Sequence, residues 1–216
     1  MTDVLTIEAV DVDGAIREAH EDLGGDTRSD FFKKAAIGGG AVLGSSAFLA
    51  GLPDLALGAP SVRQDIKILN YALLLEFLEN DFYIKSRRQA NLRGDAKRAF
   101  RVIQSHEATH VKFLKQVLGA KARKKPEFDF GNATKSQKSA LGLAQVLEDT
   151  GVTAYLGQAT RIKQPVVLRA AGTILTIEAR HAAFIRELGG KSFAPNAFDK
   201  PASMAQVLKA AGGFVA

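Results

Sequence analysis

Two Glu-x-x-His pairs, each preceded by a further glutamate about 30 residues earlier, occur in the two halves of this 216-residue chain. The pattern is duplicated, because each member of the first half recurs 71 or 72 residues later. The six side chains are Glu76, Glu107 and His110, then Glu148, Glu178 and His181. A glutamate and a histidine three residues apart lie on one face of a helix, and four such helices can surround a pair of metal ions. The sequence therefore predicts a dinuclear metal site.

The ligand set itself indicates which metals would bind. Four ionised glutamates balance the charge of two divalent cations, whereas without metal the crowded carboxylates take up protons. Oxygen donors with two imidazoles favour iron or manganese, although zinc also binds such a site. Metal binding is therefore expected to stabilise the fold.

Three more residues are candidates for the chemistry of the site. Tyr83 and Tyr155 each follow a ligand glutamate by seven residues, so we expect their hydroxyls to contact the ligands of the opposite hairpin. Glu79 lies one turn after Glu76, and its counterpart in the second repeat is Gly151. This predicts extra acid on one wall and open space on the other, for metal entry or a small oxidant. Alternatively, Glu79 points to the helix surface.

Helix-start and helix-stop residues predict four long helices over 61–90, 95–118, 136–160 and 165–189. The first is expected to begin at Ser61, whose hydroxyl caps the helix while Gln64 reaches back. The connections are short, long and short, so each half forms an antiparallel hairpin and a crossover joins them. The ligands fall near the middle of each helix, at one level.

The end of the chain is predicted to be a strap followed by a short helix capped by Ser203 with Gln206. We expect Phe193, Phe198 and Phe214 to pack on the bundle. The chain then divides into an arm over 1–60, a four-helix bundle over 61–190 and a strap over 191–216.

The chain has no cysteine, which excludes disulfides, thiolate metal sites and iron–sulfur clusters. Residues 1–60 contain four basic and ten acidic residues, so residues 61–216 are strongly basic within a net charge of +6. The densest basic cluster is Lys115, Lys121, Arg123, Lys124 and Lys125. It either meets an anionic partner such as lipid, cell-wall polymer or nucleic acid, or forms a solvated loop, which is the simpler interpretation.

The amino-terminal segment resembles a twin-arginine export signal that lacks its second arginine. An acidic stretch over 1–26 precedes it, Ser29 replaces that arginine, and a glycine-rich apolar run follows over 35–52. The residues that match the signal are Thr27, Arg28, Phe31 and Lys33. We expect export to the periplasm or cell envelope, with cleavage possible near 56–59. A membrane anchor and a cytoplasmic protein are the alternatives.

Residues 61–216 resemble the ferritin-like superfamily, and in particular the ferritin-like-domain family that includes plant and bacterial desiccation-related proteins. The similar stretches are ILNYALLLEFLENDFY, SHEATHVKFL, VLEDTGVTAYLG, ILTIEARHAAFIREL and FDKPASMAQVL. The resemblance implies an all-α, up-down-down-up bundle and an iron or manganese pair at the six residues above. Many members place Asp before the Glu of Glu-x-x-His to orient a ligand histidine, but this chain has His106 and Ile177, so orientation must come from elsewhere.

Three functions are compatible with these residues. The first is a redox enzyme in which two Fe(II) are oxidised by dioxygen or peroxide, protecting the cell envelope. The second is dismutation of peroxide by two manganese ions. The third is a stress protein without catalysis, whose metal holds the bundle together and whose basic surface coats anionic envelope components. The oligomeric state is left open, with a dimer as one possibility.

Overall fold

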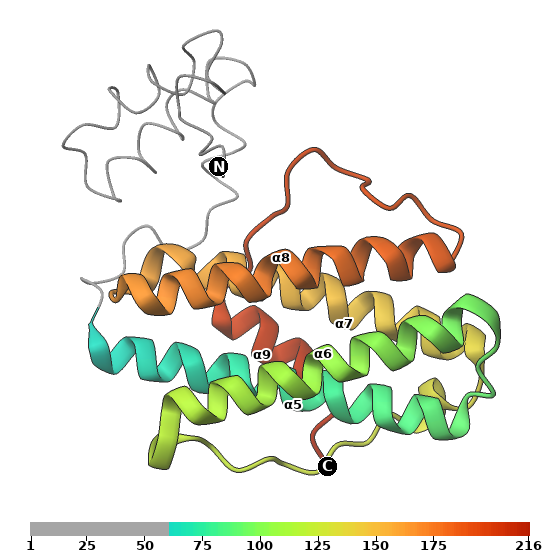
Figure 1. Cartoon of the computed structure of the whole chain (residues 1–216), viewed down its shortest axis with the longest axis horizontal. Helices are drawn as coiled ribbons and strands as arrows, with labels where there is room; N and C mark the ends of the chain where they lie inside the picture. The colour runs from blue at the N-terminus through green and yellow to red at the C-terminus, as the bar shows by residue number, and fades with distance from the viewer. Residues whose placement is uncertain (1–60) are drawn as a thin grey trace, which may run out of the picture. The chain divides into compact units, whose positions relative to one another are not determined.

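The computed structural model describes residues 61–216, and this part of the chain is helical (Figure 1). It contains five α-helices, three short 3-10 helices and no strand, apart from an isolated bridge between Phe128 and Val215. The acidic arm, the export signal and the apolar run of residues 1–60 lie outside the described residues and stay predictions. Within residues 61–216, no helix is long and apolar enough to cross a membrane.

The first hairpin consists of α5 (Val62–Gln89) and α6 (Gly94–Leu118). Ser61 caps α5 as predicted, since its hydroxyl accepts a hydrogen bond from the backbone N–H of Gln64. The prediction that the Gln64 side chain reaches back was wrong: its amide donates to the carbonyl oxygen of Arg161 at 3.1 Å. A long-range partner therefore outcompetes the local one and ties the start of α5 to the second hairpin. α6 ends at Gly119, whose φ of 54° favours glycine.

The second hairpin consists of α7 (Gln137–Gln158) and α8 (Pro165–Leu188), joined through the short helix η3 (Ala159–Arg161). Asp65 of α5 holds the turn before α8, because its carboxylate accepts backbone N–H groups of Lys163 at 2.8 Å and Gln164 at 2.9 Å. This buried acid thus has a structural partner and no part in the ligand pattern.

A long crossover joins the hairpins and contains η1 (Gly119–Lys121) and η2 (Gly131–Thr134). It follows the length of the bundle, so α6 and α7 run in the same direction and the order is up-down-down-up (Figure 1). Within its basic cluster, Lys125 pairs with Asp81 of α5 and is not simply solvated.

The carboxyl-terminal region ends in α9 (Met204–Gly212), which Ser203 and Gln206 cap as predicted. Phe214 packs against Phe130, with ring centroids 5.8 Å apart. The prediction that Phe193 and Phe198 pack on the bundle was wrong, because they are 65% and 63% exposed. The strap arches away from α8 before the chain reaches α9 (Figure 1).

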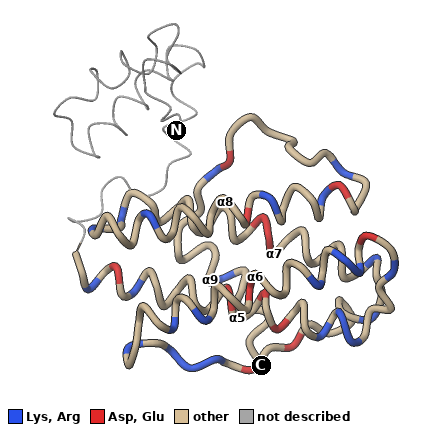
Figure 2. The backbone as a smooth tube through the Cα atoms, viewed as in Figure 1, with Lys and Arg blue, Asp and Glu red and all other residues tan. Residues whose placement is uncertain are grey.

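Acidic positions lie at the middle of the four long helices (Figure 2). Four of these side chains, Glu76, Glu107, Glu148 and Glu178, are completely buried. Burial of a carboxylate is costly unless a partner neutralises it. The fold therefore concentrates acidic side chains in its interior, where hydrogen-bonding or cationic partners must stabilise them.

Candidate metal centre

The six side chains singled out from the sequence converge at the centre of the bundle. α5 supplies Glu76, α6 supplies Glu107 and His110, and the second hairpin supplies the remaining three. The Nδ1 atom of His110 lies 3.1 Å from a Glu76 oxygen and 3.3 Å from oxygens of both Glu107 and Glu178. Three carboxylates from three helices therefore surround one imidazole nitrogen.

His181 stands in an equivalent cluster. Its Nδ1 atom lies 3.1 Å from an oxygen of Glu107, 3.2 Å from one of Glu148 and 3.9 Å from one of Glu178. Glu107 and Glu178 belong to both clusters, and within each cluster one donor atom per residue lies within 4.8 Å of all the others. Glu76 and Glu148 each belong to one cluster. Glu107 and Glu178 are therefore the carboxylates that two bound ions would share.

The two tyrosines cross between the hairpins. The Tyr83 hydroxyl, on α5, donates a hydrogen bond to Glu148 on α7, and the Tyr155 hydroxyl, on α7, donates one to Glu76 on α5. Each bond fixes one oxygen of a glutamate that belongs to a single cluster. The other oxygen of Glu148 has no hydrogen-bond partner among the described residues, and that of Glu76 faces His110. The tyrosines therefore orient these carboxylates towards the centre.

Glu79 points into the interior, where its side chain is buried and one oxygen has no hydrogen-bond partner in the described chain. The expected open space at Gly151 is absent. A Cβ atom at Gly151 would lie 3.1 Å from a Glu178 oxygen and 3.3 Å from a Glu79 oxygen. Two carboxylates approach the α7 backbone here, so a larger residue would have to displace them. The space that the missing side chain leaves is occupied by acid and does not form a channel.

His106 contacts the site through His181, a role that sequence reasoning missed. Its Nδ1 atom lies 2.9 Å from Nε2 of His181, and the two rings are stacked with centroids 5.2 Å apart. A histidine that binds metal through Nδ1 carries its proton on Nε2, which here would donate to His106. The prediction that another part of the chain orients the ligand histidines was wrong for His181. The neutral imidazole of His106 stands where many members of the family have an aspartate, and it contacts His181. The only sequence signal was its position next to Glu107.

Burial and crowding shift the proton affinities of the cluster. Burial raises the pKa of Glu76 to about 8, and burial with repulsion from Glu178 raises that of Glu79 well above its usual value. For Glu107, the imidazoles of His110 and His181 close to its two oxygens outweigh burial and lower the pKa to about 2. The carboxylates of Glu107 and Glu148 close to His181 likewise outweigh burial and raise its pKa to about 10. Because metal ligands must be deprotonated, cations would displace these protons and bind more tightly as pH rises.

The residues present fit a pair of cations. Buried donor atoms without a hydrogen-bond partner among the described residues cluster here: Glu79 Oε1, Glu107 Oε1, Glu148 Oε2, both Glu178 oxygens and His181 Nδ1. Buried polar atoms without partners are rare in folded proteins. Converging lone pairs of oxygen and nitrogen are what a hard divalent ion requires. The described chain therefore contains a buried carboxylate–histidine cluster that is compatible with metal binding.

Comparison with known proteins places this geometry in a family. The model of the ferritin-like domain matches residues 64–191, which include all four long helices and all six candidate ligands. The chain belongs to the ferritin-like domain family. A solved structure of a hypothetical protein from Methanococcus jannaschii has the same fold, with a TM-score of 0.51 and 14% identity over 74% of this chain and 97% of that one. No curated protein matches the sequence.

Proposed function

We propose that this ferritin-like protein binds two iron ions at the buried cluster and oxidises Fe(II), as a protective enzyme related to the desiccation-associated members of the family. The observation that carries the proposal is the pair of overlapping clusters, each with three carboxylates and one imidazole, that share Glu107 and Glu178. Glu107 and Glu178 would hold two ions side by side, and iron there would supply electrons to an oxidant. Iron at such a site supplies one electron per ion.

The protein residues prepare the site for this chemistry. Tyr83 and Tyr155 hold Glu148 and Glu76 in place, so the cations meet ligands that are already oriented. Complete burial of the four glutamates excludes bulk water. Burial and repulsion from Glu178 raise the pKa of Glu79, whose carboxyl group is buried beside the clusters.

Anaerobic Fe(II) titration of metal-depleted protein tests the proposal. We expect about two ions per chain, followed by near-ultraviolet absorption of Fe(III) when dioxygen or peroxide is added. Glu107→Gln should abolish both. Asp149→Asn is the matched control, because Asp149 follows a ligand in sequence but pairs with Arg186 at 2.7 Å, outside the cluster.

Two results would contradict the proposal and replace it. Oxygen release from peroxide by manganese-loaded protein, without oxidation of Fe(II), would show dismutation. Metal binding that only raises the melting temperature, with no turnover of either oxidant, would show a structural metal.

We also propose export of the protein; unchanged location of an Arg28→Ala variant on cell fractionation would refute it.

A further inference from the structure

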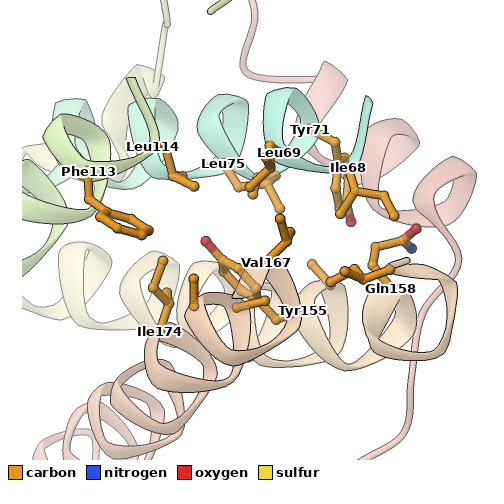
Figure 3. Close-up of a pocket in the computed structure, with 15 residues that line it drawn as sticks. Ile68, Leu69, Tyr71, Leu75, Phe113, Leu114, Tyr155, Gln158, Val167 and Ile174 are labelled. Atoms are coloured by element: carbon orange, nitrogen blue, oxygen red, sulfur yellow. The ribbon is translucent and has the colours of Figure 1, made fainter. Parts of the chain in front are cut away.

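Two hollows in the described part of the chain differ in size and in the chemistry of their walls. A void of about 20 Å³ lies between the hairpins, with Leu75, Tyr155 and Ile174 among its lining residues (Figure 3). No charged side chain of residues 61–216 lines it, and it has room for about one water molecule. A groove of about 800 Å³ lies on the surface, where α5 leads into α6. Ligand pockets hold roughly 300–1,000 Å³, so of these two hollows the groove has the size of a ligand site.

The described walls of the groove carry five basic side chains and no acidic one. α5 contributes Arg87 and Arg88, and α6 contributes Lys97, Arg98 and Arg101. All five are exposed. Figure 2 shows Lys and Arg positions gathered at this end of the first hairpin. Clefts lined by charges of one sign concentrate ions of the opposite sign, so the groove attracts anions.

Few of these charges are neutralised within the protein. Arg98 pairs with Asp95 at 2.9 Å, but both side chains are more than 60% exposed, and such surface pairs are weak. Arg87 donates a hydrogen bond to the side-chain oxygen of Gln104, which is uncharged and also lines the groove. Three basic side chains have no ion-pair or hydrogen-bond partner among the described residues: Arg88, Lys97 and Arg101.

The composition of the walls favours linked phosphate groups over other anions. Four of the five bases are arginines, whose planar guanidinium groups donate paired hydrogen bonds to phosphate oxygens. A terminal phosphate carries roughly 1.5 to 2 negative charges at pH 7, whereas a carboxylate carries at most about one. With Asp95 beside its five bases, the groove has a net charge of +4. Two or three phosphates in a row supply enough negative charge to match it.

Nucleic acid and membranes fit the groove less well. Single-stranded nucleic acid binds by stacking its bases on aromatic side chains, and no aromatic residue of the described chain lines the groove. Surfaces that bind anionic bilayers combine basic side chains with exposed apolar residues that insert between the lipids. Here the two large apolar lining residues, Ile84 and Leu92, are half-buried and buried. A small ligand therefore suits the groove best.

We propose that this groove binds a small ligand with two or more linked phosphate groups, such as tripolyphosphate or a nucleoside triphosphate. Arg88, Lys97 and Arg101 supply the charges that no described acid neutralises. Arg87 is already held by Gln104, and an ordered side chain loses less conformational freedom when a ligand binds. None of the six candidate metal ligands lines the groove, so the proposal does not depend on the proposed function.

Calorimetric titration of the full chain with inorganic tripolyphosphate, without added metal, tests the groove. We expect saturable binding that is tighter than the binding of orthophosphate or of citrate, which carries carboxylates only. ATP titrated in parallel distinguishes two sources of the phosphates: tighter binding of ATP would indicate a nucleotide, and equal or weaker binding an inorganic ligand. Absence of tripolyphosphate binding, or equally tight binding of citrate, would overturn the proposal. Binding of duplex DNA or of anionic vesicles without binding of tripolyphosphate would also overturn it.

Charge-removing variants locate the binding. Arg101→Gln should weaken tripolyphosphate binding about tenfold, because it removes a charge-assisted hydrogen bond from the groove. Arg169→Gln is the matched control, since it removes the same charge from an exposed arginine of α8 that does not line the groove. Lys97→Gln replaces the first variant if circular dichroism shows that Arg101→Gln does not fold. Equal weakening in the groove variant and in the control would show an effect of net charge alone and refute the site.

Discussion

The two hairpins supply the same ligands but surround them differently. Glu76 with Glu107 and His110 in α5–α6 matches Glu148 with Glu178 and His181 in α7–α8. The residues that surround these ligands differ between the two hairpins. The first hairpin has an extra buried acid, Glu79, and the additional imidazole of His106, where the second has Gly151 and Ile177. Duplication thus accounts for the ligands, and later divergence makes the two metal positions inequivalent.

The hairpins also depend on each other. Tyr83 of the first orients Glu148 of the second, and Tyr155 of the second orients Glu76 of the first. Glu107 and Glu178, one from each hairpin, stand in both clusters. Neither hairpin therefore contains a complete site, and metal binding should stabilise the packing of the two hairpins against each other.

The largest expected effect is a loss of bound metal, and its size should differ between glutamates that belong to both clusters and glutamates that belong to one. Glu107→Gln or Glu178→Gln should remove both ions, because each side chain reaches both clusters. Glu76→Gln or Glu148→Gln should leave about one ion per chain, since each reaches one cluster. Metal analysis after equilibration with Zn(II) measures this, and circular dichroism confirms that the variants fold. Equal losses for all four variants would contradict the assignment of bridging residues.

A smaller effect on metal affinity is expected from the contact between His106 and His181, which has no counterpart at His110. His106→Phe removes the acceptor for Nε2 of His181 and should weaken the affinity of one of the two positions by about 10- to 100-fold. His106→Asp should restore or exceed the original affinity, because a carboxylate accepts the same bond. Calorimetric titration with Zn(II) resolves the two positions, and nitrogen-15 NMR reports the His181 tautomer. An unchanged tautomer in His106→Phe would show that the contact does not orient the ligand.

The smallest effects compare two glycines of α7. Gly151→Ala should destabilise the protein by about 1–3 kcal/mol, because its Cβ meets carboxylate oxygens of Glu178 and Glu79 at 3.1 and 3.3 Å. Gly142→Ala should stabilise it by about 0.5–1 kcal/mol, since nothing lies within 4 Å and alanine favours the helix. Urea unfolding measures both. A neutral Gly151→Ala would mean that the carboxylates move aside easily.

Much of the fold followed from local signals. Ser61, Gly119 and Ser203 mark helix ends where predicted, because capping and left-handed backbone depend on neighbouring residues alone. The packing of Phe193 and Phe198 could not be predicted in this way. An aromatic residue in a strap is buried only if the strap follows the surface, and its path depends on where α8 ends and α9 docks.

The sequence by itself determined which side chains reach the centre, since the period of a helix places Glu107 with His110, and Glu178 with His181, on single faces. Tertiary structure alone decided how these side chains divide into two clusters, that His106 backs His181, and that Gly151 admits carboxylates. The reason is physical: spacing along a helix follows from backbone geometry, whereas distances between helices depend on how side chains remote in sequence pack together.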